Sequence, residues 1–212
     1  MRTIHVEYEY SVYQYEELSE GAKEVAKEWY LGGQDTETFA ECLNETLYYL
    51  FPNGNLNVEF SLNCCQGDGL NIYGEVTVSD ILQFLYGERS EDITDKLRIR
   101  LSEKDVKTIK HYNDFSSDLT INLPRNRYGC CCISNQIRFA EEWIEELEYN
   151  CFNNIKRETI LKFESVVREI FTMLCKDYET WGYKYFYEIS DEDMAEICEA
   201  NGYEFLESGN VA

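Results

Sequence analysis

Proline, histidine and long apolar runs are all scarce in this chain of 212 residues. Two prolines, no linker-like composition and no internal repeat predict one composite domain over residues 1–212, with a mixed sheet and helix part over 1–134 and a helical part over 135–212. Apolar runs of only a few residues exclude a transmembrane helix. The first ten residues alternate between apolar and polar side chains and form no apolar signal block, so we expect a cytoplasmic protein.

Cysteine is abundant, but paired cysteine spacing is lacking. The nine cysteines are odd in number, and five of them are adjacent, at Cys64–Cys65 and Cys130–Cys131–Cys132. Structural zinc usually takes ligand pairs two to four residues apart, and neither a CxxC pair nor a ligand spacing around His5 or His111 occurs. We therefore expect free thiols that act mostly as small hydrophobic side chains, with no metal and no cofactor. The alternatives are a zinc site built from Cys64, Cys130 and Cys132, or a catalytic Cys–His pair.

Basic side chains are also few, with 19 against 41 acidic residues and a net charge of −22. The acidity lies at the two ends, since residues 1–60 carry 12 acidic and 3 basic side chains and residues 135–212 carry 18 and 7. Residues 61–134 are nearly neutral, with 11 and 9. Such a field repels nucleic acid and membranes and attracts basic surfaces. We expect a basic protein surface as the partner, with no direct nucleic-acid or membrane binding; the alternative is that the acidity only aids solubility.

The hydrophobic periodicity predicts an α+β fold, in which helices cover a mostly antiparallel sheet and the C-terminal third is helical. Strands are predicted at 4–13, in a hairpin over 58–78 that turns at QGDG, at 97–101, at 118–123 and at 203–206. Helices are predicted at 19–32, with Ser19 as N-cap and Ala22, Val25 and Ala26 facing inward, at 35–50, and after a cap at Ser79. Further helices are predicted at 137–151, with Ile144 and Leu147 facing the core, in a longer segment up to Trp181, and at 191–200, with Ser190 as N-cap and Asn201-Gly202 as the stop. The expected buried stripe of the longer helix is Ile160, Phe163, Val167, Ile170, Leu174 and Trp181. The segment 103–113 fits either a strand or a helix.

The densest run of acidic residues lies on the first predicted helix of the C-terminal third. Its glutamates are Glu141, Glu142, Glu145, Glu146 and Glu148. Their eight residues span ~12 Å of helix, about one charge per ~2.4 Å, against one per ~1.7 Å in duplex DNA. Lys156 and Arg157 lie beyond an Asn-Asn break, so we expect the glutamates to be uncompensated and to bind the partner.

Two other surfaces qualify this hypothesis. Glu7 and Glu9 form the acidic outer face of the first predicted strand and are expected to add to the binding surface. Glu20, Glu24 and Glu28 form a second row, flanked by Lys23 and Lys27. As an alternative, the acidic ends only steer the approach and the middle segment makes the specific contact, through Lys104, Lys107, Arg125 and Arg127.

Catalytic motifs are not apparent. QGDG lacks the length and the lysine of a phosphate-binding loop, and a hairpin turn accounts for both glycines. Asp191-Glu192-Asp193 lies in a predicted first helical turn, where acidic side chains complement the helix dipole. We therefore expect no catalytic residues. The alternative is an enzyme that acts on nucleic acid through clustered carboxylates and a divalent metal.

Three segments spread along the chain resemble a family of acidic proteins encoded by bacteriophages and prophages. They are YEELSEGAKEVAKEWY at 15–30, VEFSLNCCQGDG at 58–69 and SDEDMAEICEANGYEFLESG at 190–209. They match an E-L-S-x-x-A-K opening helix, an S-L-S-x-x-Q-G-D-G hairpin and an E-A-N-x-Y-x-F ending. Asn63, Cys64 and Cys65 stand where the family has small polar residues.

The resemblance implies a phage-encoded protein in the cytoplasm of a bacterial host. Small acidic proteins of this kind often inhibit host defence, and some mimic nucleic acid to occupy basic clefts of CRISPR effectors or restriction enzymes. We therefore expect an inhibitor of a host nuclease or CRISPR–Cas effector. A non-inhibitory acidic phage regulatory protein is a further alternative.

Overall fold

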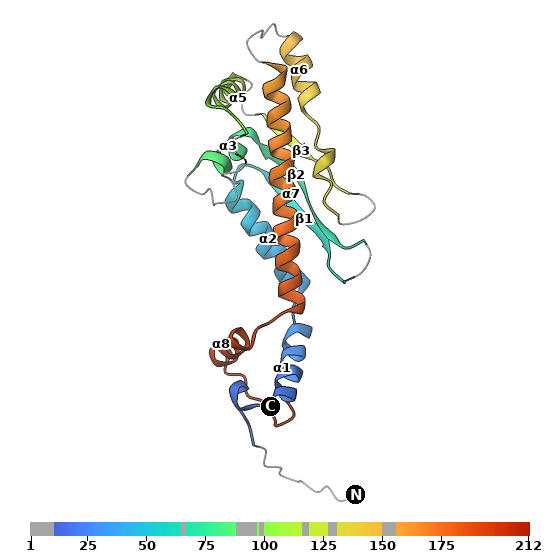
Figure 1. Ribbon diagram of the computed structural model, residues 1–212, viewed down its shortest axis with the longest axis vertical. Coiled ribbons are helices and arrows are strands. Elements are labelled where there is room, and N and C mark those ends of the chain that lie inside the picture. The colour runs from blue at the N-terminus through green and yellow to red at the C-terminus, as the bar shows by residue number, and fades with distance from the viewer. Residues whose placement is uncertain are drawn as a thin grey trace, which may run out of the picture. The chain divides into compact units, whose positions relative to one another are not determined.

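The computed structural model describes residues 11–64, 67–87, 97, 100–115, 119–126, 131–149 and 156–212 (Figure 1). The chain divides into two compact units, which we call the larger unit, Thr36–Thr180, and the smaller unit, Met1–Asp35 together with Trp181–Ala212. Neither division falls at residue 134, the predicted internal boundary, and the single composite domain stays a prediction. Within the described ranges, every helix is too short or too polar to cross a membrane.

An antiparallel sheet forms the centre of the larger unit. Its strands are β1 (Asn55–Ser61), β2 (Gly69–Thr77) and β3 (Thr120–Leu123), in the spatial order β1-β2-β3. Val58 lies opposite Ile72 in the first pair of strands, and Val76 lies opposite Ile121 in the second. The predicted hairpin and the predicted strand at 118–123 are therefore confirmed, and β2 is the central strand.

The helices of the larger unit cover this sheet and confirm the α+β fold. They are α2 (Thr36–Leu50), α3 (Val78–Tyr86), α5 (Glu103–Phe115), α6 (Ala140–Tyr149) and α7 (Arg157–Tyr187), whose last residues, 181–187, belong to the smaller unit. Phe39 of α2 meets Phe60 of β1 with ring centroids 5.2 Å apart. The predicted stripe of α7 is buried at Ile160, Phe163, Val167, Ile170 and Leu174. Trp181, predicted to continue that stripe, is instead 40% exposed.

Three local predictions for the larger unit are changed by the structure. Thr77 rather than Ser79 caps α3, because its side chain accepts the backbone N–H of Asp80. The strand predicted at 97–101 is wrong where the chain is described: Leu97 lies in a helical turn, and Leu101 is buried outside any strand. The ambiguous segment 103–113 is the helix α5.

The smaller unit joins the two ends of the chain around its own core. It contains a 3₁₀ turn, η1 (Tyr15–Glu17), and the helices α1 (Glu20–Gly32) and α8 (Asp191–Asn201). The core consists of Tyr15, Leu18, Ala22, Ala26, Met194, Cys198 and Phe205. The predicted caps Ser19 and Ser190 are confirmed, and Gly202 ends α8 with a φ of 67°.

Two predictions for the smaller unit need correction. Val25 was expected to face inward but is 37% exposed, so the buried face of α1 is formed by Ala22 and Ala26. The closing strand at 203–206 is reduced to single bridges, in which Phe205 pairs with Tyr13 and with Val211. Most of the strand predicted at 4–13 lies outside the described residues.

The C-terminal segment contacts α1 closely, and this yields a stability prediction. Gly209 has a φ of 88°, and a Cβ placed there would lie 2.1 Å from the carbonyl oxygen of Ala22. Gly202 also has a positive φ, but a Cβ there meets nothing within 4 Å. We expect Gly202→Ala to cost about 1 kcal/mol of unfolding free energy through backbone strain alone. Gly209→Ala should lower the unfolding free energy by a further ~2 kcal/mol, because α1 must also move. Denaturant unfolding of both variants measures the difference, and equal losses would contradict this close approach.

Candidate functional site

The glutamates of the predicted binding helix all lie on the exposed face of α6. Trp143, Ile144 and Leu147 fill its buried face, as expected for the two aliphatic residues. The exposed glutamates are Glu141, Glu142, Glu145, Glu146 and Glu148. The structure thus brings this whole row together on one surface of the larger unit.

This row is less free of counter-charge than the sequence indicated. The guanidinium of Arg157 donates to both carboxylate oxygens of Glu141, at 2.7 and 2.8 Å. Tyr112 also donates its hydroxyl to Glu146 at 3.4 Å. The expectation that Arg157 lies too far along the chain to neutralise the row is therefore wrong. Arg157 is the first residue of α7, and its side chain reaches the first turn of α6.

The structure describes only some of the other predicted site residues. Glu7, Glu9, Cys65, Cys130 and Arg127 lie outside the described residues. The described cysteines are free thiols: Cys42, Cys64, Cys131, Cys132, Cys175 and Cys198. Cys175 and Cys198 are buried as expected of small hydrophobic residues, whereas Cys42, Cys64 and Cys131 are exposed, against that expectation. In the part of the chain that the structure describes, no group of three or more His, Cys, Asp or Glu side chains is placed to hold a metal ion.

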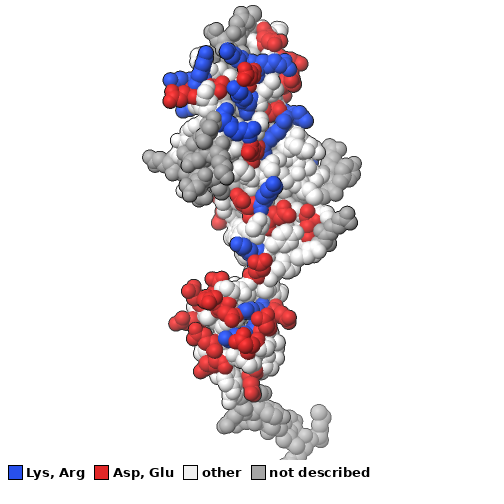
Figure 2. Space-filling view, viewed as in Figure 1, with Lys and Arg blue, Asp and Glu red and all other residues white. Residues whose placement is uncertain are grey.

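The densest negative charge belongs to the smaller unit. Its described segments, 11–35 and 181–212, carry 14 acidic and 3 basic side chains, whereas the much longer segment 36–180 carries 25 and 15. Figure 2 shows the difference on one face: acidic side chains dominate the smaller unit, and basic side chains are interspersed over the larger one. The charge asymmetry between the ends and the middle therefore becomes an asymmetry between two compact bodies.

Two of the three lysines in the smaller unit form ion pairs within that unit. Lys27 pairs with Asp191 at 2.5 Å and with Glu24 at 3.3 Å, and Lys23 pairs with Glu20 at 3.5 Å. Both lysine side chains are only 17% exposed. Because these cations already have carboxylate partners, they do little to reduce the field that the unit presents outward.

Lys27 and Asp191 connect α1 to the first turn of α8. The hydrogen bond from Lys27, followed by one from the Tyr15 hydroxyl at 2.9 Å, lowers the pKa of the Asp191 carboxyl. The hydrogen bond to Asp191 raises the pKa of the Lys27 ammonium in turn. Burial, aided by the hydrogen bond to Asp191, raises the pKa of Tyr15. All three shifts favour the paired state around neutral pH.

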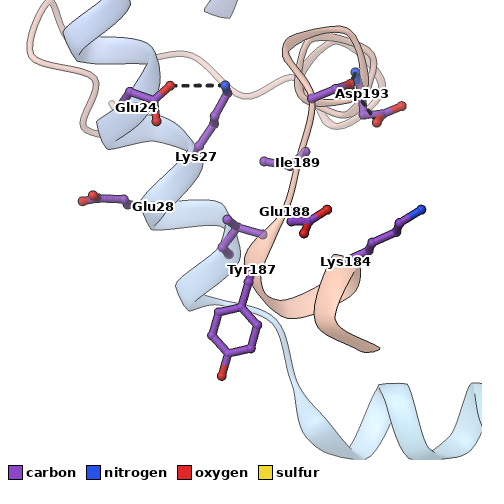
Figure 3. Close-up of a pocket in the computed structure, with 10 residues that line it drawn as sticks. Glu24, Lys27, Glu28, Lys184, Tyr187, Glu188, Ile189 and Asp193 are labelled. Carbon is purple, nitrogen blue, oxygen red and sulfur yellow. Dashed lines mark hydrogen bonds and ion pairs between the residues drawn. The ribbon is translucent and has the colours of Figure 1, made fainter. Parts of the chain in front are cut away.

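A hollow of about 670 Å³ lies between α1 and the segment that joins α7 to α8 within the smaller unit. In Figure 3, Glu24 and Lys27 point toward each other from α1, while Lys184 and Tyr187 come from the end of α7 and Ile189 comes from the segment that joins α7 to α8. We call it the first hollow. Its charged lining residues are Glu24, Lys27, Glu28, Lys184, Glu188 and Asp193. Four carboxylates against two amines leave it acidic.

A second hollow, of about 470 Å³, opens between η1 and α8. Its lining includes Gln14, Tyr15, Ala195 and Cys198, and no basic residue of the described chain lines it. The remaining four lining residues are Glu16, Glu192, Glu196 and Glu199. All four are exposed. Carboxylates with open oxygens accept hydrogen bonds from the ammonium of lysine or the guanidinium of arginine. The second hollow is thus suited to a basic side chain supplied from outside.

The sequence alone shows part of this acidic cluster. Glu192, Glu196 and Glu199 are spaced i, i+4, i+7 and therefore share one face of α8. The interpretation of residues 191–193 as a helix-dipole complement did not use that spacing. Glu16 joins the three only because the core packs η1 against α8, which no local pattern shows.

Exposed aromatic residues accompany the acidic ones. Trp29 and Tyr187 are 42% and 47% exposed, and Trp181 is 40% exposed. Trp29 keeps edge contacts with Tyr203 and Phe205, so its ring is held in place rather than free to rotate. Tryptophan and tyrosine are the residues most enriched at the energetically important centres of protein interfaces.

Comparison of the chain with family models, with curated proteins and with solved structures finds no match.

The Lys27–Asp191 pair predicts how the stability of the smaller unit depends on pH. Because the pKa of Asp191 is lowered by folding, its stabilisation is present above the ordinary carboxyl value of 3.8 and is lost as the pH falls through the folded value. Because the pKa of Lys27 is raised from 10.5, its stabilisation is lost only as the pH rises through the folded value. We expect Asp191→Asn to reduce stability at neutral pH and to flatten the acid limb relative to the parent.

The measurement is unfolding between pH 3 and 8, followed by amide exchange in α1 and α8. Glu192→Gln is the matched control, since it removes one charge from the neighbouring residue without touching Lys27 or Tyr15. If both variants had the same pH profile, the pair would not be the source of the effect.

Proposed function

We propose that this protein is an acidic inhibitor, encoded by a phage or prophage, that binds a basic surface of a host nucleic-acid-handling defence enzyme such as a CRISPR–Cas effector. The observation that carries the proposal is the composition of the smaller unit. Its described segments hold 14 acidic and 3 basic side chains, and two of those lysines are paired internally. Mimicry of nucleic-acid charge is the mechanism that this composition supports best.

Electrostatics explains what such a surface does. A basic cleft that evolved to bind phosphates attracts any dense array of negative charge, and the attraction raises the association rate. The second hollow offers four exposed carboxylates, and no basic side chain among the described residues lines it. Trp29 and Tyr187 add apolar area and faces for arginine or lysine in the same unit. The charge would therefore speed association with the partner, and contacts with the aromatic rings would slow dissociation.

The glutamate row on α6 stays a second predicted binding surface. It lies on the exposed face of α6 in the larger unit, and the charge of Glu141 is offset by Arg157. Since the two surfaces belong to different units, they can be changed independently. That separation makes a direct comparison possible.

The decisive experiment reverses three charges on each surface. One variant carries Glu192→Lys, Glu196→Lys and Glu199→Lys on α8, and the other carries Glu142→Lys, Glu145→Lys and Glu146→Lys on α6. Binding to a panel of purified CRISPR–Cas effectors and restriction nucleases is measured at low and high salt, with nucleic acid as competitor. We expect the α8 variant to weaken binding about tenfold or more, mainly through slower association. The α6 variant should weaken it by about threefold or less, because Arg157 already offsets part of that row.

Circular dichroism checks that both variants remain folded. A loss of binding in the α6 variant alone would move the site to the larger unit. Equal affinity of both variants and the parent at every salt concentration would exclude charge as the mechanism. Failure of every enzyme in the panel to bind the parent at low salt would overturn the proposed function itself.

An assay for nuclease activity separates the inhibitor from an enzyme that uses clustered carboxylates. We expect the purified protein to leave single- and double-stranded DNA and RNA intact with Mg²⁺ or Mn²⁺, because its field repels phosphates. Cleavage that persists through purification and is abolished by one carboxylate-to-amide substitution would favour the enzyme instead. Glu199→Gln and Glu145→Gln sample the two acidic surfaces.

A further inference from the structure

Two cysteines far apart in the sequence of the larger unit come together beside α7. Cys132 lies in the segment before the 3₁₀ turn η3 (Ser134–Gln136), and Cys175 lies on α7. The sulfur of Cys132 is 4.0 Å from the carbonyl oxygen of Phe171, one helical turn before Cys175. The two thiol side chains line one narrow gap that has no room for a water molecule.

The two thiols differ in access and in charge. Cys175 is buried, whereas Cys132 is half-buried and can be reached from solvent. The hydrogen bond from Cys175, with a smaller contribution from the Ser134 hydroxyl and against the effect of burial, lowers the pKa of Cys132 to about 6. The same hydrogen bond and burial raise the pKa of Cys175. At neutral pH these two directions favour a thiolate at half-buried Cys132 beside a buried thiol at Cys175.

This arrangement places a nucleophile and a second thiol on the same narrow gap. We propose that Cys132 is a modification site for peroxides and that Cys175 resolves the product into a disulfide. The Cys132 thiolate attacks one oxygen of hydrogen peroxide, the O–O bond breaks, and a sulfenic acid and hydroxide form. The Cys175 sulfur then attacks the Cys132 sulfur, the S–O bond breaks, and the departing hydroxide takes the Cys175 proton as water. Overall two thiols are oxidised and one peroxide is reduced to two waters.

Neighbouring Cys131 provides the contrast. Its sulfur is exposed and faces the carbonyl oxygens of Gly67 at 3.7 Å and Asp68 at 3.6 Å. Carbonyl oxygens do not stabilise a thiolate, and no second described thiol contacts this sulfur. Cys131 is therefore more accessible than Cys132, and within the described residues it has neither a stabilising donor nor a second thiol beside it, which makes it an internal control.

The test treats the full chain with hydrogen peroxide at pH 7 and maps the cysteines by mass spectrometry without reduction. We expect a Cys132–Cys175 cross-link before any modification of Cys131 or Cys42. In Cys175→Ala the reaction should stop at a sulfenic acid on Cys132, which dimedone traps. A thiol with a pKa near 6 is about 9% thiolate at pH 5, against about 0.03% for an ordinary thiol near 8.5. We therefore expect iodoacetamide to alkylate Cys132 about tenfold or more faster than Cys131 in the parent at pH 5, after allowance for the weaker nucleophile.

The alkylation measurement needs no substitution, so the proposal remains testable if Cys175→Ala does not fold. Cys131→Ser should leave the cross-link intact. Oxidation of Cys131 or Cys42 before Cys132, or a cross-link that joins Cys132 to Cys131 in place of Cys175, would overturn the assignment. So would equal alkylation rates for Cys131 and Cys132 across pH 5 to 9.

Discussion

The carboxylate of Glu164, on α7, accepts the backbone N–H groups of Phe139 at 2.8 Å and Ala140 at 2.7 Å, where α6 begins. These two donors belong to the helix start, where backbone N–H groups have no partner within the helix and the dipole favours negative charge. Arg168 completes the arrangement, since it pairs with Glu164 and donates to the carbonyl oxygen of Ile137 at 2.8 Å. Removing one partner of a buried carboxylate in such a network lowers the free energy of unfolding by about 3–5 kcal/mol. The placement of α6 therefore depends on one turn of α7.

The same helix positions the rest of that segment. Thr172 stands one turn after Arg168 and contacts the hydroxyl of Ser134, and the next turn brings Cys175 to Cys132. Residues at i, i+4 and i+8 share one helix face, so a single polar stripe of α7 holds the chain from Cys132 to Ala140. Both the outward display of the α6 glutamates and the meeting of the two thiols follow from this stripe. The two features belong to different chemistries but depend on one framework.

Local patterns predicted the parts of the fold that are set locally. The caps at Ser19 and Ser190, the stop at Gly202 and the alternation of the β1–β2 hairpin all depend on residues a few positions apart. Thr77 and Ser79 are both hydroxyl residues able to cap α3, and only the end of β2 decides between them. The shared face of Glu192, Glu196 and Glu199 was available from their spacing. Arg157 beside Glu141, Glu16 beside α8 and Cys132 beside Cys175 were not, because each pair is joined by tertiary packing alone.

The smaller unit combines a small core with strong self-repulsion. Like charges at helical spacing cost a few tenths of a kcal/mol per pair. Among the described residues, the core cluster of this unit is small and consists of Tyr15, Leu18, Ala22, Ala26, Met194, Cys198 and Phe205. The ion pairs of Lys23 and Lys27 within the unit offset part of the repulsion but leave most of the negative field that the unit presents to solvent. A cation that binds the exposed carboxylates of the folded unit reduces the remaining repulsion between them. Because a ligand that binds only the folded state stabilises that state, such a cation raises the stability of the unit. Dissolved salt screens the repulsion as well, but it also screens attraction to a basic partner. High salt should therefore raise the stability of this unit and at the same time lower its affinity for a basic partner. A basic partner, by contrast, stabilises the unit through binding.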